Sequence, residues 1–249
     1  MSRRLIIFIG PLLVIITWFL VTIFKLIDPL ILPLPSEVLS ALIKSLGTGE
    51  IYSHIFWTYL RVTLGLIIAL IIGIPLGILM GYSERIYKSF EFLVDFFRSI
   101  PPIVLIPLFM TIFGIGDKAK IFIVGYSCGL VLVVNTMYGV RHSDKTRLLL
   151  AKNLKANLWQ TLIKFVFPEA LPGIYAGLRI SLSRTCMVVI ASEMIIGAKY
   201  GLGEVLIRYH LCYETAKMYT IIIIVGVISY FINKIFVVWE ERLLHWTGK

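Results

Sequence analysis

Charged residues are scarce in this chain of 249 residues. Asp, Glu, Lys and Arg make up 15% of it, against about a quarter in an average soluble domain. Hydrophobic residues reach 59% and the mean hydropathy is +0.92. A single soluble core of this length cannot hide that much apolar surface, so the excess is expected to face lipid. The composition therefore excludes an ordinary soluble domain and predicts an all-α, polytopic membrane protein.

Cysteine and histidine are also rare, and neither is spaced for chemistry. The three cysteines form no CxxC pair, and the four histidines fall in separate segments. No Ser/His/Asp or Cys/His arrangement and no metal-ligand spacing is present. The sequence has no GxxxxGK[ST] phosphate loop, and no loop longer than about 35 residues that could fold by itself. We therefore expect no catalytic residue, no metal, no cofactor and no ATPase domain in this chain.

Six apolar runs are long enough, or nearly so, to cross a bilayer, which takes about 20 residues. They lie at 5–24, 57–80, 99–113, 119–140, 170–196 and 218–238. The first run lacks a small-residue cleavage site and exceeds a signal-peptide core, which predicts a retained anchor helix. The third is short and contains three prolines, which leaves its start open. Residues 50–62, EIYSHIFWTYLRV, are expected to form an amphipathic helix at the interface.

The net charge of +10 follows membrane topology and gives no sign of nucleic-acid binding. Basic residues collect between the apolar runs and form no patch with interleaved aromatics. Segments 1–4, 81–98, 141–168 and 234–249 hold fourteen Lys and Arg, whereas the loops on the other side hold seven. Cytoplasmic loops carry the excess of Lys and Arg. Both termini are therefore predicted to be cytoplasmic.

The stretch LLLAKNLKANLWQTLIKFVFPEALPG, residues 148–173, is the longest polar segment between two apolar ones. Apolar residues recur in it at steps of three and four, and so do amides and lysines, which predicts an amphipathic helix. Pro168 is expected to end that helix. Such a helix either lies on lipid headgroups as a basic surface element or docks into a groove of a soluble partner.

Blocks along nearly the whole chain resemble the nitrate/sulfonate/taurine-type branch of the permease subunits of binding-protein-dependent ABC importers. They are LPLPSEV (32–38), TYLRVTLGLIIALIIGIPLGILMGYS (58–83), FRSIPPIVLIPLFMTIFGIGDKAKIF (97–122), NTMYGVR (135–141), LPGIYAGLRISLSR (171–184) and ASEMIIGAKYGLG (191–203). The resemblance implies a MetI-like permease core with one added N-terminal helix, working as a dimer. Its implied partners are two ATPase subunits, which use the ATP, and an extracytoplasmic solute-binding protein.

In that family a Glu-Ala-Ala pattern followed by a glycine forms the cytoplasmic coupling helices that sit on the ATPase. Leu149, Leu150 and Ala151 occupy the Glu-Ala-Ala positions here, Lys155 the glycine position, and Pro168 the end of the motif. The expected ATPase-coupling residues are Leu149, Leu150, Ala151, Lys152, Asn153, Leu154, Lys155, Ala156, Asn157 and Pro168. Because lysine replaces glycine, either the turn between the two helices is straighter or the partner has changed to match.

Ionisable residues inside apolar runs need an explanation, because a charge at the membrane centre is costly. Arg61, near the end of its run, is expected to snorkel to the interface. Arg184 lies deeper and faces either the solute path or a structural ion-pair partner. Glu193 either caps an external gate or pairs structurally.

Amides and prolines in the runs carry the same ambiguity. Asn135 either lines the path or holds helices together. Arg98, Pro101 and Pro102 mark either a broken helix beside the path or an elbow at the interface. Gly65, Gly73, Gly77 and Gly81 share one helix face and are expected to permit close helix packing.

These observations predict a permease subunit in a bacterial inner membrane that moves a small, anionic solute or a vitamin precursor inward. Residues 1–56 would form the N-terminal helix and connector, and residues 57–249 the permease domain with its coupling loop at 141–168. The alternative is an ion-coupled secondary transporter, in which Arg184 and Glu193 couple solute to protons or sodium. Too few carboxylates lie in the runs to favour it.

Overall fold

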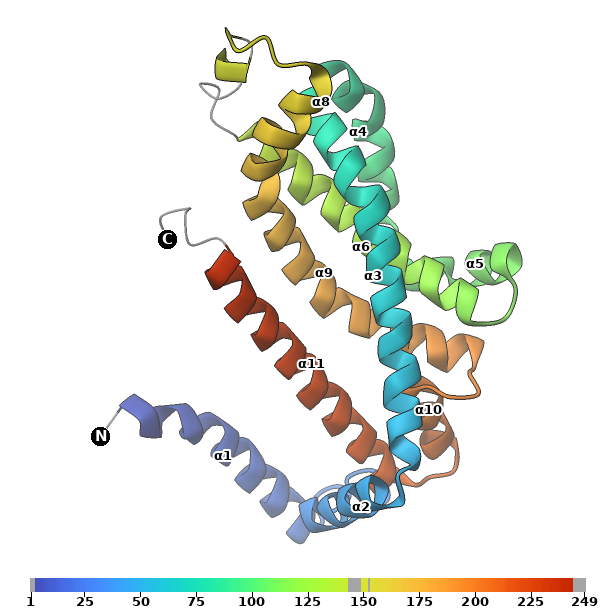
Figure 1. The fold of residues 1–249 in the computed structure, drawn as a ribbon. Helices are drawn as coiled ribbons and strands as arrows, with labels where there is room; N and C mark the ends of the chain where they lie inside the picture. The colour runs from blue at the N-terminus through green and yellow to red at the C-terminus, as the bar shows by residue number, and fades with distance from the viewer. Residues whose placement is uncertain (1–2, 143–148, 152, 244–249) are drawn as a thin grey trace. The chain divides into compact units, whose positions relative to one another are not determined.

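The computed structural model describes residues 3–142, 149–151 and 153–243, and this part of the chain is helical with no strand (Figure 1). The helices are α1 (Arg3–Ile23), α2 (Pro35–Thr48), α3 (Glu50–Tyr82), α4 (Glu84–Ser99), α5 (Ile106–Phe113), α6 (Asp117–Arg141), α8 (Leu158–Thr161), α9 (Phe167–Ile196), α10 (Leu202–Leu211) and α11 (Thr215–Leu243). A 3-10 turn, Pro102–Leu105, precedes α5, and a π-helical turn, Leu162–Val166, precedes α9.

The chain forms two compact units. The first consists of Met1–Trp57 and Lys199–Val227, and the second of Thr58–Ala198 and Ile228–Lys249. In the first unit, Pro35 begins α2, and the Glu37 carboxylate accepts the Leu34 N–H at 3.0 Å. The Thr220 hydroxyl at the start of α11 donates to the Val38 carbonyl at 3.2 Å. The second of these bonds joins α2 to α11 within this unit.

The second unit is built around α6, whose side chains are mostly buried. Gly65, Gly73, Gly77 and Gly81 of α3 all face α6: a Cβ at any of them would lie within 3.0 Å of an α6 atom. The packing role predicted for this glycine face is confirmed. An adjacent face of α6 meets α9 through Gly139 and Gly173, a pair that the sequence analysis missed.

The membrane-crossing segments differ from prediction in two places. Residues 50–62 do not form a separate interfacial helix, because α3 runs without a break from Glu50 to Tyr82. Residues 99–113 do not form one span either: α4 ends at Ser99, and the Pro102–Phe113 segment continues at 90° to it. Pro101 and Pro102 account for this break. They have no backbone N–H to donate within a helix, and each favours an extended conformation in the residue before it.

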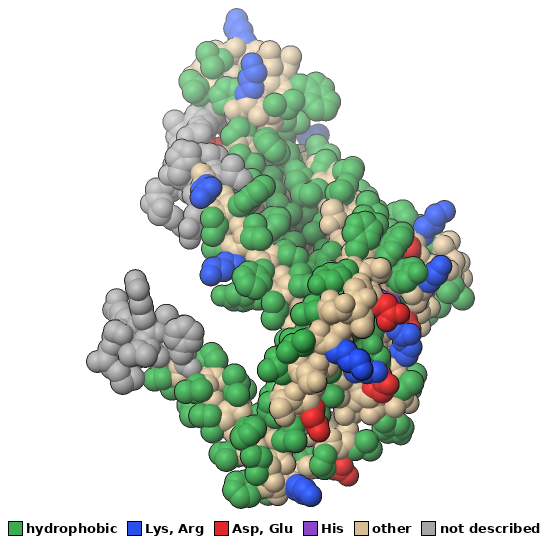
Figure 2. Space-filling model, turned by 60° about the horizontal axis from the view of Figure 1, so that its bottom comes forward, with side chains coloured by type: hydrophobic (Ala, Val, Ile, Leu, Met, Phe, Trp, Pro, Cys, Tyr) green, Lys and Arg blue, Asp and Glu red, His purple; other side chains and the backbone are tan. Residues whose placement is uncertain are grey.

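The described residues contain four single helices long and apolar enough to cross a membrane, namely Glu50–Tyr82, Asp117–Arg141, Leu158–Ile196 and Thr215–Glu240. The bent pair adds a fifth, and α1 contributes a shorter apolar stretch at Ile9–Ile23. Hydrophobic side chains dominate the face seen in Figure 2. The expected all-helical membrane fold is confirmed.

Close packing at Gly173 can be tested by adding one methyl group. A Cβ at this position would lie 2.6 Å from the Asn135 carbonyl oxygen and 2.8 Å from the Gly139 Cα, and these are backbone atoms. We expect Gly173→Ala to lower the free energy of unfolding by about 1–3 kcal/mol, the usual cost of overpacking. Gly226→Ala is the matched control, because nothing lies within 4 Å of its added Cβ. It should gain about 0.8–1 kcal/mol of helix propensity. Thermal unfolding in detergent measures both, and equal stability would contradict the close approach.

Candidate functional site

The segment between α6 and α9 forms two short helical arms joined by a turn. Leu149, Leu150 and Ala151 are helical, the chain turns at Leu154 and Lys155, and α8 begins at Leu158. Lys152 lies outside the described residues. The single helix predicted over 148–168 is therefore wrong, because Lys155 adopts a left-handed conformation with φ of 50°. Asn157 then caps α8: its side-chain oxygen accepts the Gln160 N–H at 2.8 Å, and the Gln160 side chain accepts the Asn157 N–H at 3.1 Å.

The turn at Lys155 bears on the first alternative left open by the sequence, a straighter turn between the two helices. The left-handed backbone conformation favours glycine, because a residue with a Cβ atom meets a steric cost there of roughly 1–2 kcal/mol. Lys155 keeps this conformation although it carries a side chain. The turn between the two arms is thus not straightened by the loss of the glycine.

Pro168 does not end a helix, contrary to prediction. It lies in the first turn of α9, where a missing N–H is tolerated. Helix runs without interruption from Leu158 to Ile196, because a π-helical turn precedes the proline. In this turn the Phe167 N–H donates to the Leu162 carbonyl, five residues earlier. The second arm is therefore continuous with a membrane-crossing helix.

The arms carry apolar side chains that the described part of the chain leaves exposed. Trp159 is 73% exposed, and Leu149, Leu150, Leu154 and Leu158 are all more than half exposed. Ala151, by contrast, is buried. The two arms therefore present an uncovered apolar surface, which typically marks an interaction site.

A second polar centre joins α3, α6 and α9 in the same unit. Arg61 donates to the Glu193 carboxylate at 2.6 Å and to Asp117 at 2.8 Å. Thr58 also donates to the Glu193 carboxylate, at 2.9 Å. The Lys120 ammonium lies 3.5 Å from Asp117. Two cations and two carboxylates thus form a cluster without net charge, and three of its four charged side chains are buried.

The expectation that Arg61 snorkels to the interface is wrong, since its side chain is only 4% exposed. Its carboxylate partner Glu193 lies on a helix 132 residues later, a pairing that no local pattern could show. The structure also places Glu193 in an ion pair, which is one of its two predicted roles.

The other residues predicted to line a path lie apart from this cluster. Arg184 is exposed on α9, and no carboxylate of the described residues lies within ion-pair distance of it. The Asn135 side chain donates to the Val131 carbonyl of its own helix at 2.8 Å. Arg98 pairs with Asp95 at 3.1 Å on the surface. Pro101 and Pro102 lie at the bend between α4 and α5.

Comparison with known proteins shows what this architecture is. Residues 73–245 match the family described as "Binding-protein-dependent transport system inner membrane component". The chain belongs to this family. The taurine transport system permease protein of Escherichia coli is 30% identical to this permease over all of the present chain and 92% of its own. The bicarbonate transport system permease protein of Synechococcus elongatus is 28% identical, over 79% of this chain and 72% of its own.

The permease fold is shared with solved transporters. A subunit of the MetNI methionine ABC transporter, in an inward-facing conformation, aligns with a TM-score of 0.67 at 20% identity. The alignment covers 81% of this chain and 98% of that one. The expected MetI-like core is confirmed, and the family is one of transport components and not of enzymes.

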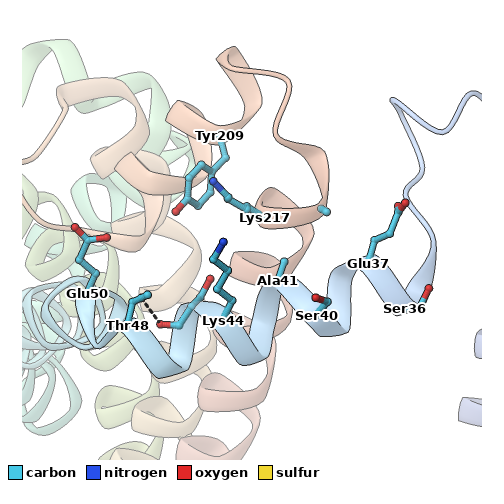
Figure 3. A pocket seen from close by; sticks show the side chains of 11 residues that line it. Ser36, Glu37, Ser40, Ala41, Lys44, Thr48, Glu50, Tyr209 and Lys217 are labelled. Atoms are coloured by element: carbon cyan, nitrogen blue, oxygen red, sulfur yellow. Dashed lines mark hydrogen bonds between the residues drawn. The ribbon is translucent and has the colours of Figure 1, made fainter.

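The first unit of the permease contains a groove along α2 that the sequence did not predict (Figure 3). Its volume is about 540 Å³. Lys44 and Lys217 point toward one another across it, with Tyr209 beside them, while Glu37 and Glu50 lie on either side (Figure 3). Lys217 is also held at 2.8 Å by Glu214. Both signs of charge are present, so this groove exerts no net attraction for anions.

The Arg61–Glu193 pair makes a prediction for the stability of the permease. Removing one partner of a buried pair typically costs about 3–5 kcal/mol, whereas replacing both by apolar residues is often neutral. We expect Arg61→Met to destabilise by that amount and Arg61→Met with Glu193→Met to recover most of the loss. Arg98→Met is the control, since its pair with Asp95 is exposed and should contribute at most about 1 kcal/mol. Unfolding in detergent measures all three, and a double variant no more stable than Arg61→Met would refute the pairing.

Proposed function

We propose that this chain is the permease subunit of an ATP-binding-cassette importer, and that residues 149–166 transmit the action of a separate ATPase. The single observation that carries the proposal is the two-armed segment. It keeps a left-handed turn at Lys155, where the related coupling motif has glycine. A simple surface helix obeying the charge rule would need no such turn.

The surface of the segment supports docking to a protein partner. Trp159, Leu154 and Leu158 expose large apolar side chains on the side of the membrane predicted to be cytoplasmic. Buried aromatic residues such as tryptophan dominate binding at protein interfaces. The motif's acidic residue is replaced by Leu149, so contact with the ATPase would rest on apolar packing more than on an ion pair.

The connection to the membrane explains how docking could act on transport. The second arm continues through the π-helical turn into α9 as one helix from Leu158 to Ile196. Displacement of the arm by a partner would therefore move α9 directly. This is the alternating-access coupling that the function requires.

The remaining parts of the proposal concern assembly and orientation. Two copies of the permease, two ATPase subunits and an extracytoplasmic binding protein would form the importer, surrounded by membrane lipid. Both termini would be cytoplasmic in a bacterial inner membrane. Arg98, Pro101, Pro102, Asn135, Arg184 and Glu193 remain candidates for contact with the path, with Glu193 acting as the paired anchor of an outer gate.

The solute would be a small anion or zwitterion of the sulfonate, taurine, nitrate or bicarbonate kind. Relatives named for taurine and for bicarbonate transport support this class. The competing secondary-transporter function needs an acidic group that takes up and releases an ion. Glu193 suits that role poorly, because Arg61 and Thr58 already hold its carboxylate.

The source of energy distinguishes the two functions. In vesicles that hold the permease with its ATPase, and with the binding protein outside, we expect uptake of taurine or bicarbonate to stop when ATP is depleted. Because no ion gradient drives the transport, a protonophore should leave the uptake rate within about twofold. Vesicles without the binding protein serve as the control. Uptake that survives ATP depletion but fails with the protonophore would identify a secondary transporter.

The turn at Lys155 provides the test of coupling. Lys155→Gly permits the left-handed φ and should keep full coupling, whereas Lys155→Pro fixes φ near −65° and removes the turn. We expect the proline variant to lose at least about tenfold of the ATP turnover stimulated by loaded binding protein. Permease yield and thermal unfolding should stay unchanged, since the turn lies outside the packed helices. A proline variant that couples normally would place the docking surface elsewhere.

A further inference from the structure

The groove along α2 lies wholly within the first unit and brings two ammonium groups toward each other. Lys44 points into it from α2, and Lys217 points toward Lys44 from the start of α11 (Figure 3). Lys44 makes no ion pair with the described residues, and Lys217 makes one, with Glu214 at 2.8 Å. Because like charges repel, this arrangement favours an anionic group between the two lysines.

The charges around the lysine pair limit what that anionic group can be. The loops on the side predicted to be extracytoplasmic hold only seven Lys and Arg, and two of these meet in the groove. Glu37 and Glu50 lie on either side, so the groove is neutral overall. A free anion therefore gains little long-range attraction. A protein surface with an acidic centre and basic flanks matches this order of charges.

The apolar edge of α2 indicates which way the groove faces. Leu39, Ile43 and Leu46 are 40% to 65% exposed and recur at steps of four and three, so they form one stripe along the helix. Lys44 lies five residues after Leu39, which places it about 140° around the helix from it. A helix with such a stripe lies on the bilayer with its polar face in water. The groove is therefore expected to open to water, where a soluble protein can reach it.

An exposed tyrosine in a strained conformation borders the groove. Residues 212–214 connect α10 to α11, and both helices contribute to the groove wall. Tyr213 has a φ of 57° and is 71% exposed. Its N–H donates to the His210 carbonyl at 3.1 Å, and the Glu214 N–H donates to the Tyr209 carbonyl at 2.9 Å. Glycine is the usual residue at such a helix end, so a tyrosine there costs stability and packs little in return.

The chemistry of this rim also suits a protein partner. Tyrosine is enriched among the residues that dominate binding at protein interfaces. Leu211, just before the connection, is 70% exposed and adds apolar area. A charged centre beside exposed apolar side chains is what a protein surface can match at once, whereas a small anion contacts only the lysines.

We propose that the groove and its tyrosine rim receive the extracytoplasmic solute-binding protein. An acidic side chain of that protein lies between Lys44 and Lys217, and Tyr213 packs against its surface. This inference rests on the proposed import function and adds the place at which the permease meets this partner. Lys217 lies two residues after Thr215, the start of a membrane-crossing helix, so docking acts directly on α11.

Charge reversal tests the lysine pair. With the permease–ATPase complex in lipid nanodiscs, we measure the Kd of the loaded binding protein that supports uptake in the vesicles described above. Lys44→Glu should raise this Kd at least about tenfold, because it sets a carboxylate against the partner's own. Lys118→Glu is the matched control, since Lys118 is exposed on the same predicted side but does not line the groove. It should change the Kd by less than about twofold. An unchanged Kd for Lys44→Glu, or an equal loss in both variants, would overturn the proposal.

Tyr213→Gly separates docking from folding. Glycine adopts the left-handed conformation without strain, so the variant should unfold at the same or a higher temperature. The Kd should nevertheless rise at least about fivefold, because the exposed ring is lost. A variant that binds as tightly as the natural permease would contradict docking at this rim.

Other occupants of the groove give different results. If a lipid phosphate lay there, a change from phosphatidylcholine to phosphatidylglycerol would shift the unfolding temperature of the natural permease and not that of Lys44→Glu. Added inorganic phosphate would do the same for a free anion. Either result, with an unchanged Kd, overturns docking in the groove.

The same complexes separate this inference from the import function. If loaded binding protein below saturation stimulates ATP turnover equally in the natural complex and in Lys44→Glu, the groove inference fails alone. If it does not stimulate the natural complex at any concentration, the import function itself fails.

Discussion

The close approach of α6 to its neighbours is the constraint on which the second unit depends. Helices in lipid gain nothing from hiding apolar surface, so they associate through van der Waals contact and hydrogen bonds. Glycines of α3 against α6, and Gly139 with Gly173 between α6 and α9, bring backbones together where a side chain would not fit. The cluster of Arg61, Glu193, Asp117 and Lys120 then joins α3, α6 and α9 through ion pairs. Acyl chains of lipid cannot replace these polar partners.

This arrangement would give the proposed coupling segment, residues 149–166, a rigid structure to act on. Because α6 and α9 are locked through Gly139 and Gly173, a force on the arm before α9 moves a packed pair of helices and does not bend one. The π-helical turn at Leu162–Val166 lies between arm and packed region. The Phe167 N–H still donates to the Leu162 carbonyl there, so the helix continues through the turn.

The sequence predicted those features that depend on local spacing. The steps of four and eight at Gly65, Gly73, Gly77 and Gly81 correctly indicated a packing face, and the prolines at 101, 102 and 107 correctly marked the third span as irregular. The family resemblance predicts a coupling role for residues 149–157 although the strict motif is poorly kept, and that role stays a prediction. These signals need only the chain within a few turns, or the order of blocks along it.

The failures have one physical cause, which is dependence on distant or alternative partners. Arg61 was expected at the interface because it lies near the end of its apolar run. The expectation failed because its partner carboxylate, Glu193, lies on another helix far along the chain. Gly139 and Gly173 are unremarkable until the two helices that carry them cross. Pro168 has two compatible positions, after a helix or in the first turn of the next one, and only the π-helical turn before it shows which is used.

The distribution of charge also bears on how a solute crosses. The charged cluster at Arg61 is internally neutralised and its carboxylates are already bonded, so it offers little field to a passing anion. Such a neutral cluster neither repels an anion nor traps it by a fixed opposite charge, so under the proposed import function the direction of movement comes from outside the membrane-crossing helices. In that proposal, the exposed apolar arms around Lys155 are the part of the described chain that would receive this input.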